Sequence, residues 1–242
     1  MNANDLIKDI NNYADPIRAQ HSQRFFKTGP GQYGEGDIFI GITMPQLRGV
    51  CRKYRNISQE DLRYLLQSLI HEHRMAAVVI MSDIFLTKSH ADQKLLYDLY
   101  LEGVRNNQIN NWDIIDVSAK NVVGMFLKNR PRDELYKLAK SDHLWSKRVA
   151  MVCAPAFFVH GDIADTLSIA EILLQDKHDL IQKAVGWMLR EVGKYVDESV
   201  LTDFLDKHAH EMPRTMLRYS IERLSSQKRA YYMNLKSAKD YK

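Results

Sequence analysis

A tryptophan and a carboxylate are spaced so that both could act on one bond. Trp112 and Asp116 lie four residues apart, and Asp113 adjoins them. On a helix, side chains at positions i and i+4 share a face. A carboxylate beside a sugar stabilises oxocarbenium character and orients water, and an indole face attracts a cation-like transition state. The pair therefore suits cleavage of a glycosidic bond. The alternative is an acidic first helical turn in which Trp112 only packs.

A second tryptophan stands among basic residues further along the chain. Lys183, Trp187, Arg190 and Lys194 recur at three- and four-residue steps, and Gly186 would let this helix approach a neighbour closely. One interpretation is a basic face with an aromatic side chain at its centre. The other is a helix that packs Trp187 into a core while its charges face water.

A third element lies between these two stretches, where Lys147 and Arg148 follow Trp145. Basic side chains on neighbouring helices could hold the phosphates that flank a reacting sugar, and such binding weakens steeply as salt rises. The chemistry at each of the three stretches depends on elements that bring them together.

Those elements are expected to be helices. From Asn56 onward nearly every segment is apolar at helical period, and strands of period two are not apparent. The segment from Arg74 to Leu86 is apolar almost all round, which predicts a helix covered on several sides. Ser58 predicts the start of a helix whose core face is Leu62, Leu65, Leu66 and Leu69. Further helices are expected at about 91–104, 111–127, 131–140, 144–158, 162–173, 176–194, 196–209 and 213–224.

Several of these helices begin with a basic residue followed by small and apolar ones. Arg74, Arg148, Lys183 and Arg214 show this plan at intervals of roughly 31 to 37 residues or twice that. Such a quasi-period indicates an all-α fold, an α-solenoid of degenerate HEAT-like repeats, in one domain over residues 1–242. The recurring cations would align into a positive stripe on the concave side, unless each one only serves its own local surface.

One segment departs from the helical plan. Residues 27–37 contain four glycines, so we expect a loop that acts as a hinge or lies on the surface. The segment lacks the Gly-Lys-Ser/Thr ending of a phosphate-binding loop and does not follow a strand. A nucleotide cofactor is therefore not expected.

The amino-acid composition limits the classes of protein to which the chain could belong. The chain has 242 residues, of which 45% are hydrophobic and 26% charged, enough for a sizeable core. No apolar run approaches the ~20 residues of a membrane span, and the first residues do not form a signal peptide, so we expect a cytoplasmic protein. The net charge of +4 is compatible with a polyanionic partner without requiring one.

Other catalytic chemistries have little support in the sequence. The pairs His71/His73 and His208/His210 are spaced i, i+2, unlike the i, i+4 pair of a helical metal site, so no metal is expected. The two cysteines form no CxxC pair, and no sequence motif places an activating base beside them. The Gly-x-Ser-x-Gly elbow of a serine hydrolase is also missing from the sequence.

The motifs together resemble the AlkD-like DNA alkylation repair family, which comprises HEAT-like DNA glycosylases. The resemblance covers most of the chain and is carried by five stretches: Arg24-Phe-Phe-Lys, Phe39-Ile-Gly-Ile-Thr-Met-Pro45, Trp112-Asp-Ile-Ile-Asp116, Trp145-Ser-Lys-Arg148 and Ile181-Gln-Lys-Ala-Val-Gly-Trp-Met-Leu-Arg-Glu191.

The resemblance implies roles for these residues. Asp116 would be the catalytic carboxylate, with Trp112 and Trp187 as aromatic walls beside the sugar of the lesion. Arg148 and Arg190 would contact phosphates, and we group Lys147, Lys183 and Asp113 with them at the DNA-binding surface. The activity implied is removal of N3- and N7-alkylated purines from double-stranded DNA by a monofunctional, monomeric enzyme without a cofactor.

Two positions depart from the family pattern, and two alternatives remain. Some members have an aromatic residue where this chain has Asn111 and a basic one where it has Ala156, which bears on DNA contact and lesion range. The chain could instead be a catalytically silent DNA-binding module, or a HEAT-type scaffold that binds proteins.

Overall fold

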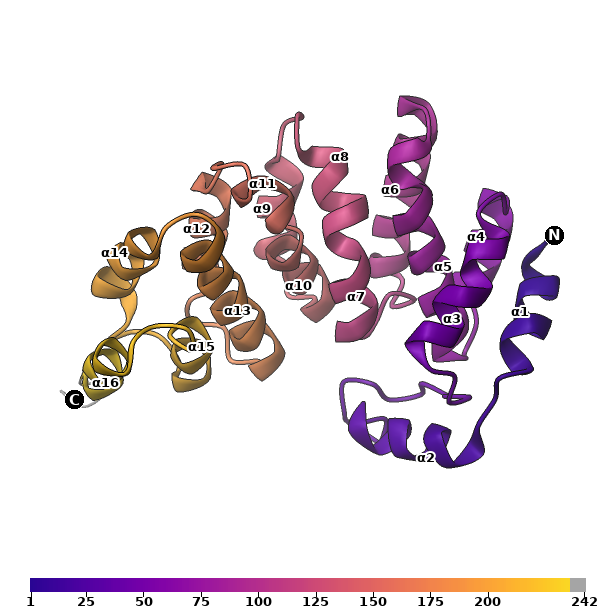
Figure 1. Ribbon diagram of the computed structural model, residues 1–242, viewed down its shortest axis with the longest axis horizontal. Helices are drawn as coiled ribbons and strands as arrows, with labels where there is room; N and C mark the ends of the chain where they lie inside the picture. Colours follow the sequence, from indigo (N-terminus) through magenta and orange to yellow (C-terminus); the bar gives the residue numbers. More distant parts are fainter. Residues whose placement is uncertain (236–242) are drawn as a thin grey trace. The chain divides into compact units, whose positions relative to one another are not determined.

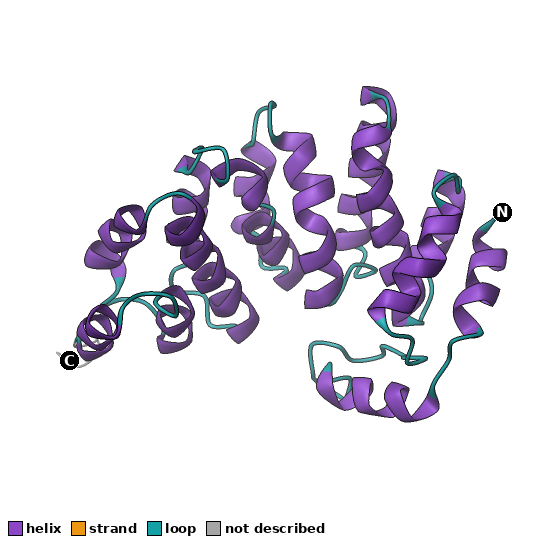
Figure 2. Cartoon of the chain, viewed as in Figure 1, coloured by secondary structure: helices purple, strands orange, loops and turns teal. Residues whose placement is uncertain are grey.

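The computed structural model describes residues 1–235, and within this range the chain consists of helices and loops (Figures 1 and 2). The β-type pairing found there is one isolated bridge between Ile38 and Ile70. The all-α fold of HEAT-like helical repeats is thus confirmed. By internal contacts the chain divides into two compact units, Met1–Phe126 and a second that begins at Leu127, so the expected single domain remains a prediction.

The first unit is built around a helix that is buried on all sides. As predicted from its apolar sequence, α5 has almost no exposed residue, and α3, α4 and α7 pack against it. The helices of this unit are α1 (Ala3–Asn11), α2 (Pro16–Phe25), α3 (Met44–Cys51), α4 (Gln59–Leu66), α5 (His71–Ile84), α6 (His90–Arg105) and α7 (Trp112–Ala119), with 3₁₀ turns at Arg52–Tyr54 and Phe85–Thr87.

Helix α4 begins where the sequence predicts and ends earlier. The Ser58 side chain accepts a hydrogen bond from the Asp61 backbone N–H and caps the helix. Leu62 and Leu65 are buried as expected, but α4 ends at Leu66. Leu69 lies beyond that end and is 71% exposed, so its assignment to the core face was wrong. The helical period cannot place a residue once the helix has stopped.

Helix α7 runs on into a π-helical turn. The turn spans Lys120–Gly124 and is followed by α8 (Met125–Leu127), so the helix expected at 111–127 is present with one irregular turn. A π-turn inside a helix adds a residue and rotates the side chains after it, which is why such turns are noted near functional sites.

Helix α2 differs from its neighbours because none of its residues is buried. It lies apart from the packed helices of the first unit, as Figure 1 shows. Its attachment runs through the backbone: Asp15 N–H donates to the Ile40 carbonyl, and Arg18 donates to the Gly41 carbonyl. A side chain at Gly41 would collide with the Asp15 carbonyl, so the close approach requires glycine there.

The second unit is centred on α13, against which α10, α12, α14 and α15 pack. Its helices lie close to the predicted segments, although each begins or ends a few residues inside them. They are α9 (Asp133–Ala139), α10 (Leu144–Val152), α11 (Pro155–Phe158), α12 (Ala164–Ile172), α13 (Asp179–Tyr195), α14 (Glu198–His208), α15 (Arg214–Ser220) and α16 (Ser226–Asn234). Helix α16 lies outside the segments expected to be helical, as do α1, α2 and α3 of the first unit. Within residues 1–235 no helix is both long and apolar enough to cross a bilayer.

Gly186 allows the close helix approach that the sequence suggested. A Cβ at this position would lie 2.4 Å from the Met216 carbonyl oxygen on α15. We expect Gly186→Ala to lower the free energy of unfolding by about 2 kcal/mol, because α13 and α15 would have to separate. Gly49→Ala on α3 is the control, since its Cβ would meet open space. Urea unfolding of both variants gives the comparison, and an unchanged Gly186→Ala midpoint would contradict the packing.

Candidate active site

Trp112 and Asp116 lie on one face of α7, as their spacing predicts. The helix begins at Trp112, whose backbone N–H donates to Asn111 Oδ1 at 2.9 Å. Both side chains are partly exposed, whereas Ile114 and Ile115 are fully buried. The first unit therefore places an indole and a carboxylate one helical turn apart, each of them partly exposed.

The indole of Trp112 is held by aromatic side chains from α2 and the loop that follows it. The Phe26 ring stacks on it with centroids 5.2 Å apart, and Phe25 meets it edge-on at 5.9 Å. The indole N–H donates to the Tyr33 hydroxyl at 3.3 Å. Two aromatic rings and one hydrogen bond from its polar atom thus orient Trp112.

Tyr33 belongs to the glycine-rich segment, which is a loop as predicted. The loop packs closely enough that a Cβ at Gly34 would lie 2.6 Å from the Phe26 carbonyl oxygen. Its function is therefore more specific than that of a hinge or a plain surface loop, because it carries Tyr33 to the indole.

A buried charge network lies beneath this face. Asp37, at the end of the loop, receives hydrogen bonds from Arg74 Nη2 at 2.6 Å and from His71 Nδ1 at 3.2 Å. The other ring nitrogen of His71, Nε2, lies 2.9 Å from the Asp113 carboxylate. One imidazole thus joins the loop to the first turn of α7.

Burial and charge oppose each other in this network. Burial alone would lower the pKa of His71, but the charge of Asp113 and the hydrogen bonds to Asp113 and Asp37 raise it to about 9. For Asp37, burial also disfavours the charged form and so raises the pKa. The hydrogen bond from His71 and the charge of Arg74 outweigh it, and the pKa of Asp37 is lowered. The His71 imidazolium and the Asp37 carboxylate therefore both carry charge at neutral pH.

Asp113 was grouped with the DNA-binding residues, and its observed bonds lie within the protein. Besides the contact with His71, its Oδ1 accepts from the Ile114 backbone N–H at 2.8 Å. These contacts fix the start of α7. A DNA contact by Asp113 stays a prediction.

The second unit holds Trp187, on α13, where it is partly exposed. Trp112 and Asp116 belong to the first unit, so the joint placement of the three residues remains a prediction.

Three of the predicted phosphate contacts of the second unit form ion pairs with carboxylates. Lys147 pairs with Asp176 at 2.8 Å, and Lys183 pairs with Asp179 at the same distance. Arg190 contacts Glu191 at 2.9 Å and also contacts Glu222. The Lys183–Asp179 pair is exposed, and an exposed pair contributes only about 0–1 kcal/mol, whereas Lys147–Asp176 and Arg190–Glu191 are partly buried.

Arg148 has a different environment. It is only 4% exposed, and its Nη1 donates to the Leu180 carbonyl at the start of α13. Arg74, the matching residue of the first unit, is equally buried, and its Nη2 also donates to Asn110 just before α7. At these two positions the recurring arginine ties one repeat to the next, so the interpretation as an exposed positive stripe was wrong for them.

The structure gives no support for chemistry at the cysteines. Both Cys51 and Cys153 are buried and unbridged, and burial raises the pKa of each thiol to about 12. Among residues 1–235, no group of three or more histidine, cysteine or acidic side chains is arranged to hold a metal ion.

The sequence matches the family of DNA alkylation repair enzymes over residues 6–224. The chain belongs to this family. A solved structure described as a predicted DNA alkylation repair enzyme from Enterococcus faecalis is similar in fold, with a TM-score of 0.67 and 16% identity. The match covers 88% of this chain and 97% of the other. No curated protein matches the chain.

The two departures from the family pattern have structural explanations in this chain. Asn111 is fully buried, caps α7 and donates from Nδ2 to Asp37 at 3.3 Å, so an aromatic ring could not take over its bonds. Ala156, on α11, is 1% exposed, so its side chain lies inside the core.

Several residues around Trp112 escaped the sequence reasoning. Phe25 and Phe26 entered it only as part of a family motif, and Tyr33, Asp37 and His71 were given no role at the site. No local spacing could have revealed them, because Asp37 and His71 meet across 34 positions and Tyr33 reaches Trp112 across 79.

Proposed function

We propose that the protein is a DNA glycosylase that hydrolyses the N-glycosidic bond of N3- and N7-alkylated purines in duplex DNA. The observation that carries the proposal is the pair formed by Trp112 and Asp116, which are partly exposed on one face of α7 in a member of a DNA alkylation repair family. The cationic purine leaves with the bonding electrons as a neutral base. Water adds to C1′ and loses a proton, which leaves an abasic site.

Each residue has a distinct part in this proposal. The Asp116 carboxylate stabilises the positive charge that develops on the sugar and orients the attacking water. The Trp112 face attracts the same charge, and its contacts with Phe26 and Tyr33 fix the ring before DNA arrives. Trp187 of the second unit would form the other aromatic wall.

The first unit also offers a surface suited to a phosphate backbone. The exposed helix α2 and the loop after it contain no acidic residue from Pro16 to Gln32. Arg18, Arg24 and Lys27 lie in this stretch and are exposed. A hollow of about 460 Å³ is lined by Gln20, Gln23, Arg24, Thr28, Gly29 and Gln32. Amide and guanidinium groups of this kind bind phosphate and sugar oxygens in DNA complexes.

This surface can be tested through salt dependence. We expect Arg24→Ala to weaken binding of undamaged duplex DNA and to make the slope of log K against log salt shallower by about 1, because one phosphate contact is lost. Arg105→Ala, at the exposed end of α6, is the matched control and should leave the slope unchanged. Equal slopes for the two variants would exclude Arg24 from the interface.

The function itself is tested by base release. Purified protein incubated with methylated duplex DNA should liberate 7-methylguanine and 3-methyladenine, detected by chromatography and mass spectrometry. Release of neither base, by a protein that binds the DNA in a salt-dependent way, would instead identify a silent DNA-binding module. The carboxylate partners of Lys147, Lys183 and Arg190 favour a third candidate, a protein-binding scaffold, since they occupy cations that DNA would use. Absence of DNA binding would point to a protein-binding scaffold.

A further inference from the structure

Helix α5 begins with four polar side chains in succession, and the proposed base excision uses none of them. His71, Glu72, His73 and Arg74 are each no more than 5% exposed. Burial of a polar or charged group costs free energy unless a partner compensates it. The partners of these four side chains therefore show what the first turn of α5 holds in place.

Three of the four hold segments of the chain that approach α5. Glu72 accepts a hydrogen bond from the Gly41 backbone N–H at 2.8 Å. Arg74 donates to the Ser68 carbonyl at 2.7 Å, and His73 Nδ1 lies 2.9 Å from the Ser68 hydroxyl. These contacts secure the chain just before α5 and the segment to which α2 is attached.

The ring nitrogens of His71 connect two parts of the candidate active site. Nδ1 lies 3.2 Å from the carboxylate of Asp37, which ends the loop that carries Tyr33. Nε2 lies 2.9 Å from the carboxylate of Asp113, which follows Trp112 on α7. Because the ring is buried, both contacts are shielded from water, and the loop is held to the start of α7.

The same ring also contacts the aromatic side chains that support Trp112. The Phe39 ring stacks on His71 with centroids 4.4 Å apart, and the Phe26 ring lies 5.4 Å away. Phe26 in turn stacks on Phe39 at 5.0 Å and on Trp112 at 5.2 Å. One residue thus supports the indole by three routes, through the loop, through α7 and through the aromatic stack.

We infer that His71 is a positioning residue of the candidate active site, which keeps the indole of Trp112 in contact with the hydroxyl of Tyr33. It acts through Asp37 and Asp113 and is too deeply buried to touch DNA itself. In its bearing on excision the inference rests on the proposed function, whereas the placement of the indole can be measured without any reaction.

The test follows the indole N–H of Trp112, which donates to Tyr33, through its exchange with water in NMR spectra of the full-length protein. Trp112→Phe identifies the signal, and Tyr33→Phe gives the exchange rate without the acceptor. We expect His71→Gln to speed the exchange about fivefold, the effect of losing one hydrogen bond. If His71→Gln does not fold, Asp113→Asn is used in its place, because it removes the carboxylate that faces the imidazole from α7.

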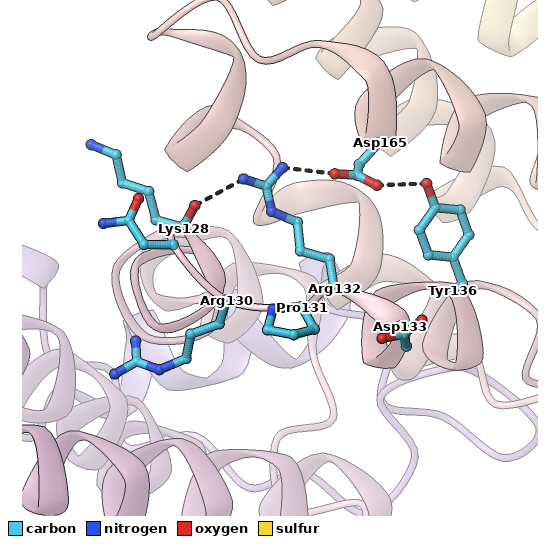
Figure 3. Close-up of a pocket in the computed structure, with 8 residues that line it drawn as sticks. Lys128, Arg130, Pro131, Arg132, Asp133, Tyr136 and Asp165 are labelled. Carbon is cyan, nitrogen blue, oxygen red and sulfur yellow. Dashed lines mark hydrogen bonds and ion pairs between the residues drawn. The ribbon is translucent and has the colours of Figure 1, made fainter.

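Two controls separate positioning from a general loss of stability. His73→Gln removes the other buried histidine of the same turn, which contacts Ser68 instead of the loop or α7. Tyr136→Phe removes a tyrosine hydroxyl that donates to Asp165 in the second unit (Figure 3). Both should leave the exchange of the indole unchanged. A wild-type rate in His71→Gln, or an equal acceleration in His73→Gln, would overturn the inference.

Base release gives a second, independent readout. In a protein that excises bases, His71→Gln should lower the single-turnover rate by up to about 10²-fold, since a misplacement of about 1 Å can cost that much. Affinity for alkylated duplex should change little. An unchanged rate, or a fall in affinity as large as the fall in rate, would contradict a positioning role. If the wild type releases no base, the proposed function fails, and the exchange rates still decide the role of His71.

Discussion

Asp116→Asn should abolish the release of alkylated bases while leaving DNA binding intact. The asparagine keeps the size of the side chain and removes the charge that stabilises the oxocarbenium-like sugar. Removing one preorganised electrostatic group from a catalytic site costs about 10²–10³-fold in rate, which corresponds to roughly 3–4 kcal/mol. We expect a loss of at least this size in single-turnover release of 7-methylguanine.

The control is Asp142→Asn, which removes one carboxylate from an exposed position of the second unit. It should excise bases at the wild-type rate. Affinity for alkylated duplex should change little in either variant, because the loss at Asp116 concerns the transition state. Excision by Asp116→Asn at the wild-type rate would show that the carboxylate has no catalytic role, even if the protein proves to be a glycosylase.

The sequence alone was sufficient for the helices between α4 and α15 and for one half of the candidate site. Trp112 and Asp116 are one helical turn apart, so their common face follows from the period of the helix. The buried helix α5 was equally predictable, because its residues are apolar all round. In both cases the information is local, carried by neighbours within one element.

The support of Trp112 could not be predicted in this way. It comes from Phe25, Phe26 and Tyr33, and Tyr33 lies on a loop whose path depends on close contacts such as that of Gly34 with the Phe26 carbonyl. The recurring arginines show a related limit: the pattern identified Arg74 and Arg148 correctly as repeated features. Whether a repeated cation faces a groove or a carbonyl of the next repeat depends on how the repeats pack. The spacing of residues in the sequence gives no information about that packing.

The second large effect concerns His71, which should make the stability of the protein depend on pH between about 6.5 and 9. Its pKa is about 9 in the folded protein and near 6.5 when unfolded, so the protonated imidazole stabilises the fold. That contribution is complete below 6.5 and is lost as the pH rises through 9. The difference in pKa corresponds to about 3 kcal/mol. Urea unfolding of the wild type at pH 6 and pH 9.5 should show a loss of this order.

His71→Gln should remove most of that pH dependence and be less stable at pH 6, since Asp37 and Asp113 would lose a shared cation. His73 is the internal control: burial lowers its pKa to about 4, so it titrates below 6.5 and contributes nothing in this interval. A wild-type loss that persists in full in His71→Gln would place the titrating group elsewhere; the buried thiols of Cys51 and Cys153 add a smaller loss near pH 9 that both proteins share. If the loss disappears and base release falls with it, the network that anchors the loop and α7 also positions Trp112 for catalysis.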